Sequence, residues 1–140
     1  MPTSIDSIVV VAASAYLLLV ALLAGSFINL AADRLPRGES VVRPRSHCRA
    51  CGRVLNVVDL MPVAGYLVRR GRCAGCGASI GISAPAVEGL CGVAMLASLL
   101  LLGPWLGAVA GLGAVVVIGV AVVGLGFGRL QRATRGSRQG

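Results

Sequence analysis

The sequence predicts an all-α integral membrane protein with about three transmembrane helices and one charged, cysteine-containing loop. Hydrophobic residues make up 56% of the 140 residues, and charged residues make up only 13%. The charges are gathered in blocks, which leaves two long stretches without a charged side chain. A helix needs about 20 apolar residues to cross a hydrocarbon layer of about 30 Å. The two stretches therefore predict membrane spans rather than the core of a soluble domain.

The first uncharged stretch lies between Asp6 and Asp33. Its length predicts a transmembrane helix over 8–32, preceded by a short external N-terminus at 1–7. A cleavable signal peptide is the alternative interpretation. No basic residue precedes the stretch, however, and the stretch is too long for the apolar region of such a peptide. We therefore expect a membrane anchor.

The second uncharged stretch runs from Gly89 to Gly128, about twice the length that one helix needs. Gly103, Pro104 and Trp105 form a natural break within it, because glycine and proline interrupt helices and tryptophan favours the membrane interface. The remaining segments are then a loop at 33–84, transmembrane helices at 85–102 and 105–128, and a basic tail at 129–140.

Charge distribution predicts the orientation in the membrane. All thirteen basic residues are arginines; nine lie in the loop against three acids, and four follow Phe127. Short cytoplasmic segments are enriched in basic residues, so the loop and tail are expected in the cytoplasm and the N-terminus outside. The same asymmetry explains the net charge of +8, and membrane lipids are the expected surroundings of the spans. Nucleic acid is not expected as a partner, because Tyr66 is the only aromatic residue of the loop available for stacking.

Two C-x-x-C-G turns in the loop predict a metal site. Each turn is part of a longer repeat, since Arg45 to Leu55 has the same spacing of arginine, cysteine, glycine and apolar residues as Arg70 to Ile80. Four thiolates complete a tetrahedral zinc shell and leave no open position, which is typical of structural zinc. A pair of disulfides is the alternative, but a cytoplasmic loop would be in a reducing compartment. The expected ligands are Cys48, Cys51, Cys73 and Cys76.

Polar residues at the end of the first span share one face of the expected helix. Gly25, Asn29 and Asp33 are spaced four residues apart, and Ser26 lies within one turn of Asn29. They can form a contact between helices, with Gly25 allowing close approach, or a substrate or cofactor surface at the cytoplasmic boundary. Both interpretations stay open. Arg34, which follows, is expected to reach the level of the lipid phosphates.

Glu88 lies one turn into the second expected span, after Pro85. A carboxylate is favourable near a helix N-terminus, which gives Glu88 a structural role. If it faces Asn29 and Asp33 across the two helices, it can instead hold a substrate ammonium group. The sequence does not separate these roles.

The stretch from Gly25 to Gly89 resembles the N-terminal domain of the type IV prepilin peptidase family, bacterial inner-membrane enzymes that cleave prepilin leader peptides and N-methylate the new N-terminus. The sequence departs from the usual family pattern around Asp59, where an aromatic pair and an asparagine are replaced, and at Ser83-Ala84-Pro85. The matching pieces follow in the family's order: Gly25-Ser26-Phe27-Ile28-Asn29, Arg34-Leu35-Pro36-Arg37-Gly38-Glu39-Ser40, Pro44-Arg45-Ser46-His47-Cys48 with Cys51-Gly52, Asp59 with Pro62, Arg70-Gly71-Arg72-Cys73 with Cys76-Gly77, and Pro85 with Glu88.

This resemblance implies structural zinc, S-adenosylmethionine as methyl donor and a type IV prepilin or pilin-like protein as substrate. It also implies a multi-pass protein of the bacterial inner membrane. Three carboxylates can orient the substrate ammonium group or take its proton: Glu88, Asp33 and Asp59. Substrate or cofactor binding is implied for the remaining residues that match the family pattern: Gly25, Ser26, Asn29, Arg34, Pro62 and Gly71.

The peptidase half of the family depends on two membrane-proximal aspartates, one in a Gly-x-Gly-Asp-like motif. Asp6, Asp33 and Asp59 are the only aspartates of this chain, and Arg129 occupies the position of the motif aspartate after Gly124 to Gly128. We therefore expect N-methylation without peptide-bond cleavage by this chain alone, beside a separate short peptidase. The alternatives are a noncatalytic scaffold that docks prepilin or such a peptidase, and a degenerate remnant without a role in pilin maturation.

Overall fold

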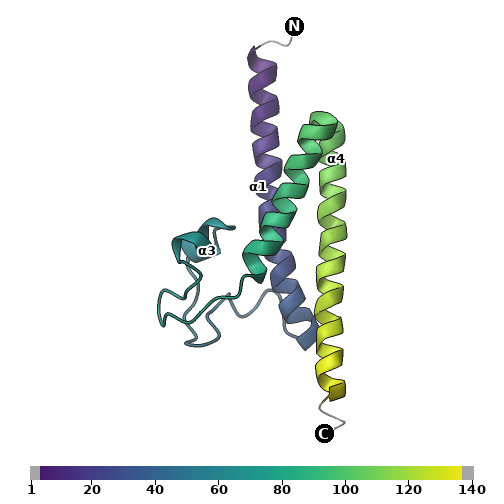
Figure 1. The fold of residues 1–140 in the computed structure, drawn as a ribbon. Helices are drawn as coiled ribbons and strands as arrows, with labels where there is room; N and C mark the ends of the chain where they lie inside the picture. The colour runs from purple at the N-terminus through teal and green to yellow at the C-terminus, as the bar shows by residue number, and fades with distance from the viewer. Residues whose placement is uncertain (1–3, 137–140) are drawn as a thin grey trace.

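The computed structural model describes residues 4–136, and within this range all regular secondary structure is helical. Figure 1 shows long helices packed side by side, with a loop that projects from one flank. The elements in chain order are α1 (Ser4–Arg34), the 3-10 helix η1 (Leu35–Arg37), α2 (Val57–Leu60), α3 (Ala64–Val68) and α4 (Ser83–Gly136).

The long element α4 is a helical hairpin. Gly103 has φ 77° and ψ 178°, which no α-helix contains, and Pro104 starts the second arm. The two arms approach closely because glycines face the first arm. A Cβ atom on Gly107 would lie 2.5 Å from the Ser98 carbonyl oxygen, and one on Gly111 would lie 2.6 Å from the Met95 sulfur. Gly107 and Gly111 therefore serve packing between the two arms of the chain.

α1 packs against both arms of α4 (Figure 1). It runs antiparallel to the first arm, where a Cβ atom on Gly25 would lie 2.7 Å from the Glu88 Cα atom. The second arm approaches the end of α1, since a Cβ atom on Gly126 would lie 2.5 Å from the Ala32 carbonyl oxygen. Small residues allow such contacts between backbones. The core between the helices consists of Ala21, Cys91, Met95, Leu99 and Val115.

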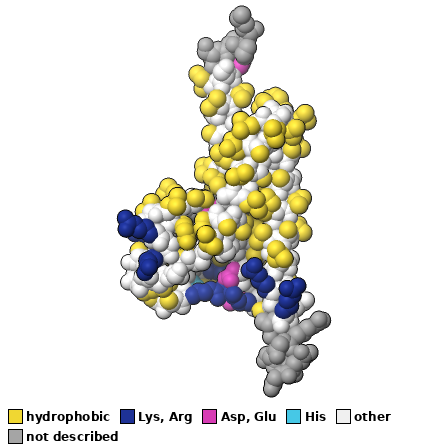
Figure 2. Space-filling model, viewed as in Figure 1, with side chains coloured by type: hydrophobic (Ala, Val, Ile, Leu, Met, Phe, Trp, Pro, Cys, Tyr) yellow, Lys and Arg dark blue, Asp and Glu magenta, His cyan; other side chains and the backbone are white. Residues whose placement is uncertain are grey.

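Apolar side chains cover the outside of these helices (Figure 2), and the exposed ones include Leu101 and Trp105 near the bend. Two helical segments, Ile5–Arg37 and Ser83–Arg132, are long and apolar enough to cross a membrane. An apolar outer surface of this extent suits lipid rather than water. The chain is thus an all-helical membrane protein.

The loop at 38–82 lies near the same end of the molecule as the end of α4, and the beginning of α1 lies at the opposite end (Figure 1). The loop differs from the sequence expectation in two respects: it is shorter than the predicted 33–84, and it contains the short helices α2 and α3. These helices escaped prediction since each spans a single turn or little more, too short for helical periodicity to be recognised. The expected N-terminus at 1–7 and tail at 129–140 fall partly outside the described residues.

Substitution of Gly107 tests the hairpin contact. Gly107→Leu is expected to lower the free energy of unfolding by about 1–3 kcal/mol, because the new side chain must displace the backbone of Ser98 and Leu99. Thermal unfolding in detergent measures the change. Gly113→Leu is the matched control on the same arm, since nothing lies within 4 Å of the position of its Cβ atom. Equal stability of the two variants would contradict the packing described.

Candidate metal centre and adjoining groove

The four cysteine sulfurs of the loop converge as the sequence predicts. All four Sγ atoms lie within 4.8 Å of one another. The Sγ atoms of Cys48 and Cys76 are 3.8 Å apart, and those of Cys51 and Cys73 are 3.9 Å apart. A tetrahedral metal with bonds of about 2.3 Å to sulfur requires sulfurs about 3.8 Å apart. The cluster therefore fits a metal ion, and its cysteines are not joined by disulfides.

The two cysteine turns have the same backbone geometry. In the first, the Gly52 N–H donates to the Cys48 carbonyl at 2.8 Å; in the second, the Gly77 N–H donates to the Cys73 carbonyl at 2.9 Å. Both glycines have φ 71°, a left-handed conformation that other residues adopt at a cost. A single β-bridge closes each turn, between His47 and Val54 and between Arg72 and Ser79. The sequence repeat is thus a structural repeat that presents two thiols from each half.

Electrostatics of the cluster favour a bound cation. Backbone N–H groups of Cys76 and Gly75 lower the pKa of Cys73 to about 6, so its metal-binding thiolate form exists at neutral pH. The N–H of Ala78 lowers the pKa of Cys76, but the neighbouring sulfurs, Cys51 first, together with burial, raise it to about 11. A second thiolate is thus unfavourable beside the first without a positive charge. A divalent cation removes this repulsion.

An ion-pair cluster around Asp59 joins the metal site to the two short helices. The Asp59 carboxylate, with only 5% of its side chain exposed, accepts from Arg53 at 2.9 Å and from Arg69 at 2.7 Å. It also accepts from the Asn56 N–H at the start of α2, while the Asn56 side chain accepts from the Asp59 N–H. The Asn56 N–H, followed by the two arginines, lowers the pKa of Asp59, although burial opposes this.

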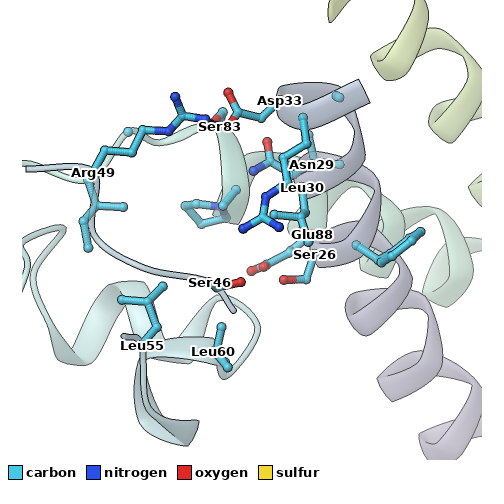
Figure 3. Close-up of a pocket in the computed structure, with 18 of the residues that line it drawn as sticks. Ser26, Asn29, Leu30, Asp33, Ser46, Arg49, Leu55, Leu60, Ser83 and Glu88 are labelled. Atoms are coloured by element: carbon cyan, nitrogen blue, oxygen red, sulfur yellow. Dashed lines mark hydrogen bonds and ion pairs between the residues drawn. The ribbon is translucent and has the colours of Figure 1, made fainter. Parts of the chain in front are cut away.

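A groove of about 1350 Å³ runs between the loop, the end of α1 and both ends of α4. Figure 3 shows side chains from α1, the loop and the start of α4 directed into one space, with Ser26 and Glu88 close to each other on its wall. Seven residues predicted as site residues line the groove, namely Ser26, Asn29, Asp33, Arg34, Asp59, Glu88 and the metal-site residue Cys73. The polar face predicted for the end of α1 and Glu88 of α4 therefore line the same groove.

Glu88 connects the loop to the helices. Its side chain is buried, and its Oε2 atom accepts a hydrogen bond from the Val63 N–H at 2.6 Å. Val63 has φ 54°, an unusual conformation for a β-branched residue that costs on the order of 1–3 kcal/mol. This hydrogen bond helps to hold the strained residue in place.

Asp33 and Arg34 lie where α1 ends. The Asp33 carboxylate pairs with Arg37 at 2.8 Å and also with Arg49. The buried Arg34 side chain donates to the carbonyls of Ser40 at 2.8 Å and Pro44 at 3.0 Å. The expectation that Arg34 reaches the lipid phosphates is therefore wrong, because the loop folds back over it and supplies acceptors.

Gly25, Pro62 and Gly71 do not line the groove, although they were predicted among its binding residues. Gly25 lies in the contact between α1 and α4, and Pro62 immediately precedes the strained Val63. Gly71 has φ 67°, and a Cβ atom there would lie 2.7 Å from the Tyr66 hydroxyl. In the structure these residues permit close approach or a turn next to the site.

Sequence reasoning missed the arginines that hold the site. Arg49 pairs with Asp33 at the end of α1, and Arg53 and Arg69 both pair with Asp59 within the loop. The excess of arginine in the loop was a signal of basic charge, but it carried no information on pairing.

Metal content tests the cysteine cluster. The purified protein is expected to hold one metal ion per chain, and Cys73→Ser is expected to lose it because the shell loses a thiolate. Elemental analysis after dialysis measures this. Cys91→Ala is the matched control, since Cys91 lies in the helical core away from the loop. Full metal content in Cys73→Ser, or loss in Cys91→Ala, would contradict the assignment.

Asp59→Asn tests the ion-pair cluster. At pH 7 the free energy of unfolding of the variant is expected to be about 1.5–3 kcal/mol lower than that of the parent protein, because two guanidinium groups lose their charged partner. The pKa of Asp59 is lowered by folding, so its contribution is present above the unfolded value of about 3.9 and is lost as the pH falls through the lower, folded value. The difference between Asp59→Asn and the parent should therefore vanish in acid. Thermal unfolding against pH measures it.

Asp33→Asn is the comparison for this experiment. Its carboxylate is 41% exposed, so the loss at pH 7 should stay below about 1 kcal/mol. An effect of Asp59→Asn no larger than that of Asp33→Asn would show that the buried cluster adds no stability.

The bacterial peptidase A24 N-terminal domain family model matches residues 19–102. A prepilin leader peptidase/N-methyltransferase of Myxococcus xanthus is 42% identical over 84 residues, which cover 60% of this chain and 25% of that protein. A Bacillus subtilis protein of the same name is 39% identical over 67 residues, covering 48% and 27%. The type 4 prepilin-like proteins leader peptide-processing enzyme of Escherichia coli is 33% identical over 93 residues, covering 54% and 35%.

No solved structure matches the chain. The chain spans about a quarter to a third of the length of these curated relatives. The family match extends over more than half of the chain and includes all four cysteines, the groove face of α1 and Glu88. The chain therefore belongs to the prepilin peptidase family through its bacterial peptidase A24 N-terminal domain.

Proposed function

We propose that the chain acts in type IV pilin maturation, and that its groove holds the N-terminus of a processed prepilin for N-methylation. The observation that carries this proposal is the burial of the Glu88 carboxylate without a cationic partner among the described residues. Asp33, Glu39 and Asp59, the other carboxylates lining the groove, each pair with arginine. Glu88 accepts from a neutral backbone N–H and has no ion-pair partner among the described residues. A buried carboxylate without a counterion favours a cationic ligand.

The ammonium group at a peptide N-terminus is such a ligand. Asn29 and Ser26 lie on the same wall as Glu88 and supply hydrogen-bonding groups that orient it. A neutral amine is the nucleophile for methyl transfer, and an α-amino group with a pKa of about 7.7–8.0 loses its proton easily. Glu88 or Asp33 would accept that proton, while Asp59 would hold the loop wall. The names of the relatives support this class of substrate.

S-adenosylmethionine would supply the methyl group. Small-molecule pockets measure about 300–1000 Å³, so a groove of about 1350 Å³ accommodates a nucleoside cofactor beside a peptide end. Arg34 and Asp33 at the end of α1 would contact the cofactor, and Gly25, Pro62 and Gly71 would shape the surrounding backbone. The chain's own contribution is to position the amine and shield it from water.

We assign structural zinc to the four cysteines. Four sulfur ligands complete its tetrahedral shell, so the ion would hold the loop and take no part in the reaction. Cys48, Cys51, Cys73 and Cys76 would supply all of its bonds.

We place the chain in the bacterial inner membrane with three spans, at 8–32, 85–102 and 105–128. The bend at Gly103 and the 85% exposed Trp105 support a reversal of chain direction within α4 at the external membrane–water interface. The loop and the tail would be cytoplasmic and the N-terminus external, in keeping with the arginine distribution. Leader-peptide cleavage would belong to a separate short peptidase.

A second candidate function is a noncatalytic scaffold that docks prepilin or that peptidase. The ion pairs of Asp33 and Asp59 favour it, because carboxylates held by two arginines already serve the fold. A scaffold would need the same folded loop but no methyl donor.

The intact mass of the mature pilin separates the two candidates. Cells would contain a cognate prepilin and a short peptidase, together with the protein, Glu88→Gln, or neither. One added methyl group on the pilin is expected only with the parent protein. Glu88→Gln retains an oxygen for the Val63 N–H but removes the charge that would hold the amine, so methylation should fall at least tenfold. Asp6→Asn is the control, because it removes a carboxylate at the opposite end of α1. The pilin should be methylated normally in the presence of this variant.

Unmethylated pilin whose cleavage still depends on this protein would favour the scaffold. If neither cleavage nor methylation depended on it, both functions would be excluded. Metal content of each variant shows that the loop is folded.

A further inference from the structure

The segment 57–68, which contains α2 and α3, exposes apolar side chains on the flank of the loop. Val57 is 80% exposed, and Leu67 and Val68 are each 67% exposed. Asp59 is the single charged residue of the segment, and its carboxylate is buried between Arg53 and Arg69. The surface that this segment presents is therefore apolar although the loop as a whole is strongly basic.

This segment lies beside the membrane helices and not beyond their ends. Val63 donates to Glu88, which is five residues into α4 and thus about 7.5 Å along the helix from Ser83. Figure 1 agrees, since α3 lies well above the lower ends of α1 and α4. If α4 enters the bilayer near Ser83, the apolar segment lies at the depth of the headgroups.

Basic residues border the segment. Arg70 and Arg72 lie two and four residues after its end and are exposed. Figure 2 shows arginine or lysine side chains on the outer edge of the loop and apolar side chains above them, towards the long helices. Apolar side chains with adjacent arginines are the pattern of segments that bind the surface of an anionic membrane.

We propose that residues 57–68 form an interfacial lipid-binding element, with Leu67 and Val68 inserted at the boundary of headgroups and acyl chains and Arg70 and Arg72 against anionic headgroups. Figure 2 shows apolar side chains on the loop next to the apolar surface of the long helices, which argues for lipid as the occupant of both surfaces. The inference requires the chain to be embedded in a membrane but does not require methyl transfer. It places the Glu88 end of the groove at the membrane surface.

Tryptophan fluorescence in vesicles tests the proposal on the full chain. The single native tryptophan is removed with Trp105→Phe, and Leu67→Trp is introduced as the probe. Val42→Trp is the matched control, because Val42 is 76% exposed on another part of the loop. Vesicles contain phosphatidylcholine with phosphatidylglycerol, and quenching is compared between lipids with a nitroxide near the headgroup and acrylamide in the water. Metal content verifies that each loop is folded.

The Leu67→Trp probe is expected to be quenched by the nitroxide lipid at least threefold more strongly than the Val42→Trp probe, and less by acrylamide. Adding Arg70→Gln and Arg72→Gln should weaken lipid quenching in vesicles rich in phosphatidylglycerol. Equal acrylamide quenching of the two probes would overturn the proposal by placing the segment in water. A Leu67→Trp probe shielded from both quenchers would also overturn it, because protein would then cover the segment. Neither outcome bears on pilin methylation.

Discussion

One buried carboxylate joins the two parts of this protein. The backbone of Glu88 lies against Gly25 in the contact between α1 and α4, and its side chain accepts from Val63 in the loop. Burial of a carboxylate is unfavourable unless hydrogen bonds compensate for the lost water. The position of the loop beside the helices, and with it the shape of the groove, depends on this arrangement. The strained backbone of Val63 is a further sign that the junction imposes its geometry on the loop.

Because the loop has almost no apolar core, other interactions must fix its shape. Its buried residues are Gly65, Gly71 and Cys73, which contribute little hydrophobic area. Segments of this size usually need a metal or another cross-link to fold. A metal ion bound by the four cysteines would join the two halves of the repeat, and Asp59 joins one half to α2 and α3. The metal and the ion pairs would together perform the task that a core performs in a larger domain.

The sequence predicted those features that depend on local pattern. Uncharged stretches indicated the long helices, and the repeated C-x-x-C-G spacing indicated the four converging sulfurs, because two turns of identical geometry present equivalent thiols. Helical periodicity also placed Ser26, Asn29 and Asp33 on the groove face. Pairing across the loop was not predictable. Which arginine meets Asp33 or Asp59 depends on how the loop folds back, and the wrong expectation for Arg34 has the same cause.

The same carboxylate that holds the fold can also recognise a ligand, because the two roles use different properties of Glu88. Its hydrogen bond to Val63 satisfies one acceptor but leaves the negative charge, since an N–H is a dipole and not a counterion. The neighbouring carboxylates differ in this respect, because arginines neutralise Asp33 and Asp59. A cation that enters the groove therefore gains most at Glu88, where low exposure weakens the screening by water. If residues 57–68 lie at the membrane surface, that charge faces a boundary where a peptide N-terminus can approach without leaving the bilayer.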